Sequence, residues 1–408
     1  MAQTMNSPST GSLPAVSLPT GFRFAGFTSG IKKSGRPDLS LIVSDRPTVA
    51  AAVLTTNLVH ATSIDWCREI LPSDDFRAVI VNSGNANACT GKQGQENQQR
   101  VCQQLAELLE CDARQIAFLS TGIIGHQLPM EKLQSGLPQA VNQLANSDEA
   151  FLQAATAITT TDNARKTAGT SFQSAGKQYN ITVMAKGAGM IGPNMATMLC
   201  VVVTDFPLSV SEAKKALKTA ADQSFNAISV EGHMSTNDAM ILLTSQGQNS
   251  EGPAEPFQDF QRALNEVTLS CAKLIPADGE GAKHLVQISV SGCQNHSDAD
   301  RIARSIANSA LVKTAIYGND PNWGRIVSAA GYAGPPFESE NVTLKINGTT
   351  VFQAGTPANF DAAQVSGAMK ANPETHLELS VGVGPGAATH WTSDLTVDYV
   401  RFNSDYST

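Results

Sequence analysis

Short apolar runs alternate with amphipathic segments along most of the chain, and the runs end in Gly, Asn or Ser. Their length and content of β-branched residues are typical of buried strands. The predicted strands lie at residues 39–43, 49–54, 78–81, 116–119, 199–203 and 240–243. Between two of them, Val101, Leu105 and Leu108 recur at the spacing of one buried helix face. This mixture of strands and helices predicts a layered α+β fold.

Two more helices are expected in the middle of the chain. Ser209 and Glu212 stand at the spacing of a capping box, in which each side chain satisfies the backbone amide of the other residue. Farther on, Phe257, Phe260 and Leu264 share one helical face. Helices of this kind cover the faces of a sheet.

The last part of the chain predicts a second, smaller α/β domain at 293–408. Ile302, Ile306 and Leu311 lie on one side of a predicted helix. An Asn347-Gly348 hairpin and paired C-terminal strands follow, and the last strand is expected at 395–402.

The remaining residues divide into a leader and a larger domain. Residues 1–19 are rich in Ser, Thr and Pro and have neither a basic start nor a continuous apolar core, so we expect a disordered leader and no secretory signal. Residues 20–292 then form the larger α+β domain. The whole chain has 408 residues, of which 41% are hydrophobic, enough for proper cores.

Charge and cysteine content exclude several classes of protein. The net charge of -8 comes from 36 acidic and 28 basic residues without runs of one sign, which disfavours nucleic acid as a partner. No run approaches the roughly 18 uncharged apolar residues of a spanning helix, so no membrane partner is expected. Seven scattered cysteines without a Cys-x-x-Cys pair indicate reduced thiols in the cytoplasm and no metal site.

A glycine-rich segment at 186–199 carries the candidate chemistry. Gly187, Gly189 and Gly192 spell G-x-G-x-x-G after a predicted strand, which is the pattern of a dinucleotide site. That site needs a helix next, to direct its N-terminus at a pyrophosphate. Here Pro193 and a strand-like run follow instead, so a nucleotide-binding protein is only a distant alternative.

A second interpretation makes Thr197 a nucleophile that is created when the chain breaks after Ala196. A threonine hydroxyl is a poor nucleophile unless a base lies beside it, and a new α-amino group with a pKa of about 7.7 to 8.0 supplies one. The same hydroxyl can attack the preceding carbonyl before water releases Thr197. Small Ala196 and the nearby glycines allow the strained approach that this step requires.

The segment Asn194-Met195-Ala196-Thr197-Met198-Leu199 resembles the cleavage site of the ornithine acetyltransferase family. The resemblance covers nearly all of the chain outside the leader, in order. It extends through Gly30-Ile31-Lys32-Lys33-Ser34-Gly35, Asn82-Ser83-Gly84-Asn85-Ala86-Asn87-Ala88, Ser120-Thr121-Gly122, Ser235-Thr236-Asn237-Asp238, Asp278-Gly279-Glu280-Gly281, Asp320-Pro321-Asn322-Trp323-Gly324-Arg325 and Asp398-Tyr399-Val400-Arg401 with Asn403 and Asp405-Tyr406.

The resemblance implies a role for each matching residue. Thr197 is both the cleavage residue and the acetyl acceptor, and Thr121 with the Gly122 amide forms the oxyanion hole, whose donors each lower the barrier by about 2.7 to 4 kcal/mol. The residues implied to bind substrate are Thr160, Lys186, Thr197, Glu280, Asn403 and Thr408. Taken alone, most of these positions are more typical of polar turns, caps and solvated strand ends.

The resemblance also implies the reaction, the fold and the partners. The family passes acetyl from N-acetylornithine to glutamate through acetyl-threonine, without a cofactor, and some members also take acetyl from acetyl-CoA. Its fold is an α/β sandwich of the ornithine acetyltransferase and aminopeptidase type, and its two-chain protomers pair into a heterotetramer. A hydrolase or aminopeptidase, in which water accepts the acyl group, is the alternative. Glu231, His233 and Ser407 depart from the family, which more often has aspartates at the first two positions and arginine at the third.

Overall fold

The computed structural model describes residues 17–192, 198–245 and 257–405. Its larger sheet has the strand order β4-β3-β2-β9-β7-β6-β5, and β1 pairs with β2 outside that path. The strands are β1 (Phe22–Phe27), β2 (Leu39–Leu54), β3 (Ser73–Asn85), β4 (Ile116–Ile123), β5 (Lys166–Ser174), β6 (Lys177–Lys186), β7 (Leu199–Thr204) and β9 (Ala239–Thr244).

Strand β2 joins two halves of this sheet. The residues before its register shifts pair with β1 and β3, and those after them pair with β9. The shifts lie between Val43 and Ala50, and irregularities of this kind bend a strand. The sequence predicted two strands here, at 39–43 and 49–54. The structure has one bent strand because Thr48 keeps pairing with Phe76 across the polar interruption.

The two halves pack face to face around a shared core. Ile42 and Val79 come from one half, and Leu199, Val201 and Ile241 come from the other. Helices α1 (Thr62–Ile70) and α4 (Asp148–Ala157) add side chains to the same core. The larger unit is therefore a sandwich of two sheet halves.

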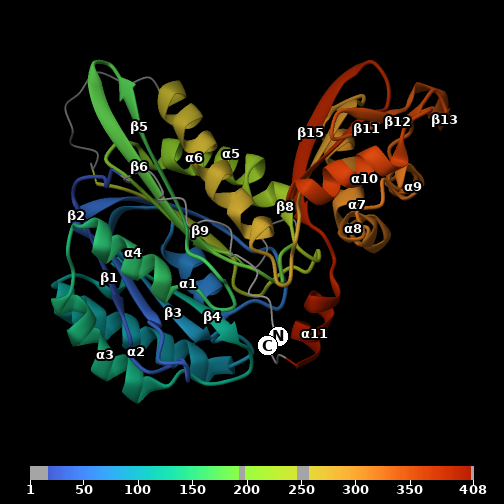
Figure 1. Ribbon diagram of the computed structural model, residues 1–408. Helices are drawn as coiled ribbons and strands as arrows, with labels where there is room; N and C mark the ends of the chain where they lie inside the picture. The colour runs from blue at the N-terminus through green and yellow to red at the C-terminus, as the bar shows by residue number, and fades with distance from the viewer. Residues whose placement is uncertain (1–16, 193–197, 246–256, 406–408) are drawn as a thin grey trace.

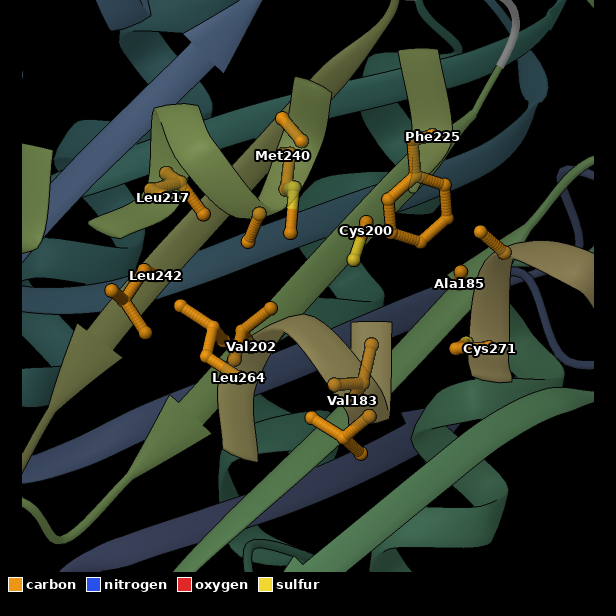
Figure 2. Packing of buried hydrophobic residues seen from close by; sticks show 14 of the residues in the cluster. Val183, Ala185, Cys200, Val202, Leu217, Phe225, Met240, Leu242, Leu264 and Cys271 are labelled. Atoms are coloured by element: carbon orange, nitrogen blue, oxygen red, sulfur yellow. The ribbon is translucent and has the colours of Figure 1, made fainter. Parts of the chain in front are cut away.

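Helices cover both outer faces of the sandwich (Figure 1). Helices α2 (Gly91–Leu109) and α3 (Met130–Asn142) pack on the half that contains β3 and β4. Helices α5 (Val210–Gln223) and α6 (Phe257–Ala277) pack on the other half, where Figure 2 shows Cys200 and Val202 of β7 facing them. The alternation along β7 follows the two-residue period of a strand between two cores. The layered α+β prediction is confirmed.

The predicted start of α5 is also confirmed. The Ser209 hydroxyl accepts a hydrogen bond from the Glu212 amide at 3.3 Å, and the Glu212 carboxylate accepts one from the Ser209 amide at 2.9 Å. Short 3-10 turns complete this unit at Ala113–Gln115 and Phe225–Ala227.

A second unit contains a sheet of the order β13-β12-β11-β14-β10-β15-β8. Its strands are β8 (Ile228–Ser229), β10 (Leu285–Gly292), β11 (Thr343–Ile346), β12 (Thr349–Gln353), β13 (Thr356–Pro357), β14 (Glu374–Ser380) and β15 (Gly384–Ser393). Its helical elements are α7 (His296–Asn308), α8 (Ala310–Tyr317), α9 (Trp323–Gly331), the turn Ser339–Asn341 and α10 (Ala362–Ala371).

The second unit begins earlier than the sequence predicted. The boundary at 293 would assign β10 to the larger domain, yet β10 pairs with β14 and β15, and its Val286, Ile288 and Val290 fill the second core. The expected helix through Leu311 is two helices, because Ser309 ends α7 and caps α8, which leaves Leu311 exposed. The hairpin at Asn347-Gly348 is confirmed.

The two ends of the chain also differ from the expectation. The strand predicted at 395–402 is helix α11 (Val397–Asp405), since the Thr396 hydroxyl accepts a hydrogen bond from the Tyr399 amide at 3.0 Å, as an N-cap residue does. The helix lies apart from the second sheet and beside the larger unit (Figure 1). Of the expected leader, the structure describes only residues 17–19, and Leu18 already packs on the core of the larger unit.

All seven cysteines are free thiols. Among the described residues, none of the helices combines the length and the apolar character that a bilayer crossing requires.

Candidate active site

A pocket of about 210 Å³ lies where the larger unit meets α11, a size that suits a small molecule. Its walls come from the end of β4, the turn before β5, the turn after β6, the segment before β9 and α11. The lining residues are Thr121, Gly122, Ile124, Thr160, Thr161, Lys186, Gly189, Met190, Glu231, His233, Ser235, Thr236, Asn237, Glu280, Tyr399 and Asn403.

Lys186 and Thr121 form the base of this pocket. Lys186 is the last residue of β6 and is only 2% exposed, and its Nζ donates a hydrogen bond to the Thr121 Oγ1 at 3.3 Å. Burial lowers the pKa of Lys186, while the Asp162 carboxylate opposes that shift. The contact joins β4 of one sheet half to β6 of the other.

Asp162 holds the turns around Lys186 in place. Its carboxylate accepts hydrogen bonds from the Gly187 amide at 2.7 Å, the Thr160 amide at 2.9 Å and the Lys166 Nζ at 2.6 Å. Burial alone would raise the pKa of Asp162, but Lys166 and Lys186 hold it well below its usual range. Asp162 is therefore a buried anion that fixes the backbone on both sides of the pocket base.

Glu280 connects the pocket to the C-terminal helix. Its carboxylate accepts hydrogen bonds from the Thr161 hydroxyl at 2.8 Å and from the Asn403 Nδ2 at 3.0 Å. Its amide donates to the Ala188 carbonyl at 2.8 Å. A Cβ atom at Gly189 would overlap the Glu280 carboxylate, so glycine is required for this close approach.

Glu231 is a second carboxyl group in the pocket. The amides of its neighbours Val230 and Gly232 both donate to the Ile191 carbonyl, at 3.0 and 2.9 Å, which fixes the backbone that carries Glu231. Both of its carboxyl oxygens are buried, and neither has a hydrogen-bond partner among the described residues. Burial, with a smaller contribution from Glu280, raises the pKa of Glu231 to about 7.

The expected nucleophile Thr197 lies outside the described residues, as do Ala196 and the terminal Thr408. The described residue after it, Met198, donates its amide to the Asp238 carboxylate at 2.9 Å. Burial raises the pKa of Asp238 well above its usual range. On the other side, Gly192 packs directly against the backbone of Gly232 and His233. The segment 230–239, which lines the pocket, thus contacts the chain on both sides of 193–197.

The glycine pattern does not form a dinucleotide site. Gly187, Gly189 and Gly192 precede β7, a strand inside the sheet that pairs with β6 and β9, and β7 is the next described element. The helix N-terminus that a pyrophosphate would need does not follow these glycines among the described elements. Gly189 and Gly192 instead bring the backbone close to Glu280 and to Gly232.

A family model described as the ArgJ family matches residues 23–408. The chain belongs to the ArgJ family. It is 49% identical to the arginine biosynthesis bifunctional protein ArgJ of Rhodopirellula baltica, over 99% of this chain and 98% of the relative. It is 43% identical to the protein of the same name from Geobacter sulfurreducens, over 95% and 99%.

Solved structures include two similar chains. The crystal structure of the arginine biosynthesis bifunctional protein ArgJ from Bacillus halodurans is 33% identical, with a TM-score of 0.47, over 50% of this chain and 96% of that one. The ornithine acetyltransferase of Mycobacterium tuberculosis, solved in complex with ornithine, is 36% identical, with a TM-score of 0.39, over 45% and 95%.

The structure places six of the residues that the family resemblance implied in one pocket. These are Thr121, Gly122, Thr160, Lys186, Glu280 and Asn403. Their distances along the chain reach hundreds of residues, so the fold brings them together. Their chemical roles stay predictions.

Sequence reasoning missed several groups in the same place. Among the three consecutive threonines, Thr161 is the one whose hydroxyl bonds Glu280. Asp238 stands in a string that the sequence analysis noted without assigning it a role, and Asp162 directly follows the three threonines. Asp238 comes directly before β9 and Asp162 four residues before β5, so a carboxyl group near the start of a strand was the available signal.

Proposed function

We propose that the protein is a self-cleaving acyltransferase of arginine biosynthesis, which moves acetyl from N2-acetyl-L-ornithine to L-glutamate through acetyl-Thr197. The observation that carries this proposal is one small pocket with a buried ammonium, Lys186, and two carboxyl groups, Glu231 and Glu280. Such a charge pattern complements amino acids, which present carboxylate and ammonium groups together. The names of the curated relatives, all arginine biosynthesis proteins, support the same pathway.

The first half-reaction transfers acetyl to the protein. The Thr197 hydroxyl attacks the amide carbonyl of acetylornithine while its own α-amino group takes the hydroxyl proton. The tetrahedral oxyanion receives hydrogen bonds from the Thr121 hydroxyl and the Gly122 amide. The C–N bond then breaks, the leaving α-amino group of ornithine takes the proton, and acetyl remains on Thr197 as an ester.

The second half-reaction returns the acetyl group to a substrate. The α-amino group of glutamate attacks the ester carbonyl, the C–O bond to Thr197 breaks, and the released oxygen recovers a proton. The same oxyanion donors serve both steps, because both pass through a tetrahedral intermediate at one carbon. Lys186 binds a substrate carboxylate, and Glu280 with Asn403 binds an amino group.

The nucleophile arises by self-cleavage. Thr197 attacks the Ala196 carbonyl, the peptide C–N bond breaks to leave an ester, and water hydrolyses that ester to give two chains. The new N-terminus of the second chain supplies the base for transfer. We further propose that two such cleaved protomers assemble into a heterotetramer and that the enzyme works in the cytoplasm without a cofactor.

A second activity belongs to the same proposal. The relatives are called bifunctional. In this activity the Thr197 hydroxyl attacks the thioester carbonyl of acetyl-CoA, the C–S bond breaks and the CoA thiol leaves with the proton, and glutamate then accepts the acetyl group from the Thr197 ester. This route would make N-acetylglutamate without acetylornithine. The active-site steps after acetylation are the same.

The test is an intact-mass measurement followed by transfer assays. The proposal expects two fragments, 1–196 and 197–408, and ornithine with N-acetylglutamate as products. Assays with acetyl-CoA in place of acetylornithine report on the second activity. Acetate as the product, with no gain of N-acetylglutamate, would instead identify a hydrolase or aminopeptidase.

A further inference from the structure

Glu231 and Glu280 face the same pocket but differ in their hydrogen bonds. Glu280 is satisfied by the Thr161 hydroxyl and the Asn403 amide group. Glu231 has two buried oxygens without a hydrogen-bond partner among the described residues. A buried carboxyl group in this state is costly, and most such groups in proteins are paired. The two carboxyl oxygens of Glu231 that lack hydrogen-bond partners therefore point to a ligand.

The backbone holds Glu231 firmly toward this ligand. The amides of Val230 and Gly232 both donate hydrogen bonds to the Ile191 carbonyl. Gly192 packs against the backbone just after Glu231. Residues held on both sides lose little freedom when a ligand binds, which favours their use in recognition. Glu231 is thus a fixed feature of the pocket wall.

Groups from several separate parts of the fold influence the charge of Glu231. Glu280 repels it, and Lys313 of α8 attracts it. The Lys313 ammonium already donates to the Thr392 hydroxyl at 2.8 Å and to the Ser393 carbonyl, so it does not neutralise Glu231 by direct pairing. Tyr399 of α11 lies near both carboxyl groups. The backbone amides of Ile191 and His233 also face Glu231 and lower its pKa slightly, but neither meets hydrogen-bond geometry.

The two substrates of the proposed reaction carry opposite charges at the end of their side chains. Acetylornithine ends in an ammonium, and glutamate ends in a carboxylate. One pocket must accept them in turn. A carboxyl group that gains or loses a proton can do so, since its ionised form accepts hydrogen bonds from an ammonium and its neutral form donates one to a carboxylate.

We propose that Glu231 is a specificity residue that binds the charged group at the end of the side chain of both substrates. As a carboxylate it binds the side-chain ammonium of the diamino-acid donor, and as a carboxylic acid it donates a hydrogen bond to the side-chain carboxylate of the acceptor. The inference rests on the proposed function and adds a residue to which the family resemblance assigned no role. The proton that Glu231 gains comes from solvent after ornithine leaves and returns to solvent with the product.

The experiment compares wild type with Glu231→Gln in the two half-reactions. Single-turnover release of ornithine measures the donor step, and acetyl-enzyme mixed with glutamate measures the acceptor step. Glutamine keeps the size of glutamate but stays neutral. We expect kcat/KM for acetylornithine to fall by about tenfold or more at pH 8, because a charge-assisted hydrogen bond is lost. The glutamate step at pH 8 should fall little or improve.

An acetyl donor that lacks the side-chain ammonium makes the test more specific. N-acetylnorvaline has the ornithine carbon chain and lacks the terminal amino group. Wild type should prefer acetylornithine over acetylnorvaline by about tenfold or more, and Glu231→Gln should lose most of that preference. Glu231→Asp, which keeps the carboxyl group, should retain part of it. The matched control is Glu266→Gln on the exposed side of α6, which should leave the preference unchanged.

The pH profile separates this role from a structural one. The ratio of wild type to Glu231→Gln cancels ionisations that do not depend on Glu231. Lys313, whose pKa burial lowers to about 7, is coupled to Glu231 and its titration shifts with the substitution. Across pH 6 to 8, about the pKa of Glu231, the ratio should rise with pH for acetylornithine and fall with pH for glutamate. An unchanged donor preference in Glu231→Gln, or flat ratios in a variant that cleaves normally, would overturn the inference. A wild type that releases no ornithine from acetylornithine would instead refute the proposed function.

Discussion

The Lys186 Nζ donates a hydrogen bond to the Thr121 Oγ1 at 3.3 Å, and this contact joins the two halves of the sheet at the base of the pocket. An ammonium that faces the oxygen of this hydroxyl leaves the Thr121 proton available for another acceptor. In the proposed mechanism, that acceptor is the oxyanion.

Thr121→Val removes the hydroxyl and keeps the shape of the side chain. We expect kcat for transfer to fall by about 10²- to 10³-fold, since loss of one oxyanion donor costs about 2.7 to 4 kcal/mol. Steady-state kinetics with acetylornithine and glutamate measure the effect, and Thr170→Val on strand β5 is the matched control. Near-normal kcat would remove Thr121 from the oxyanion hole. Gly122 is a poorer probe, because its φ of 136° and the nearby Gly84 backbone resist any side chain.

Gly189→Ala tests whether substrate binding needs the close approach of the backbone at Gly189 to the Glu280 carboxylate. The new Cβ atom would push the Glu280 carboxylate away from Thr161 and Asn403, and this flexible side chain can move without disturbing the backbone. We expect KM for the substrates to rise severalfold, while the free energy of unfolding changes by less than about 1 kcal/mol. Kinetics and urea unfolding measure both quantities. Gly367→Ala in α10, where a Cβ meets open space, is the control, and equal KM values in the two variants would contradict the assignment.

Deletion of residues 403–408 tests whether the tail binds substrate. The Asn403 contact with Glu280 is lost, so we expect a higher KM or no transfer, whereas cleavage at Thr197 needs only local groups and should continue. Asn403→Ala should show a smaller defect of the same kind. Electrophoresis follows cleavage and kinetics follow transfer. A truncated enzyme with unchanged kinetics would show that the tail has no part in binding.

The lowered pKa of Asp162 in the folded protein should make the stability depend on pH. Its folded pKa is lowered, so its stabilising contribution is present above the unfolded pKa of about 3.9 and is lost as pH falls through the folded pKa. Asp162→Asn should lower the free energy of unfolding at pH 7 by about 1 to 3 kcal/mol, because it breaks a buried ion pair with Lys166 while Lys166 keeps its second pair with Asp278. The difference from wild type should shrink toward pH 2 in urea unfolding. Asp45→Asn, which breaks an exposed pair with Arg23, should cost at most about 1 kcal/mol, and an equal loss in both variants would be against this view.

Local patterns predicted the layered α+β fold but not the connections between its strands. The buried apolar run of β7 and the capping box at Ser209 depend on neighbours in sequence, and both are confirmed. The path of β2 and the place of β10 depend on partners far along the chain, which periodicity does not contain. The apolar residues of α11 misled the strand prediction, because their exposure there is set by a tertiary position that sequence spacing cannot show.

The residues of the candidate site also divide into those that the sequence identifies and those that only the folded structure identifies. The resemblance selected Lys186 and Glu280, since both stand in distinctive strings. It assigned no role to Glu231, whose significance lies in two buried oxygens without partners, a property of the folded environment alone.

The most direct test of the central claim is the intact mass of wild type and Thr197→Ala, before and after incubation with acetylornithine alone. We predict that wild type consists of fragments 1–196 and 197–408 and that only the second fragment gains the mass of one acetyl group, which glutamate then removes. Thr197→Ala should remain one chain and gain nothing. Complete cleavage of Thr197→Ala, or a cleaved wild type that transfers acetyl without ever carrying it, would contradict the account.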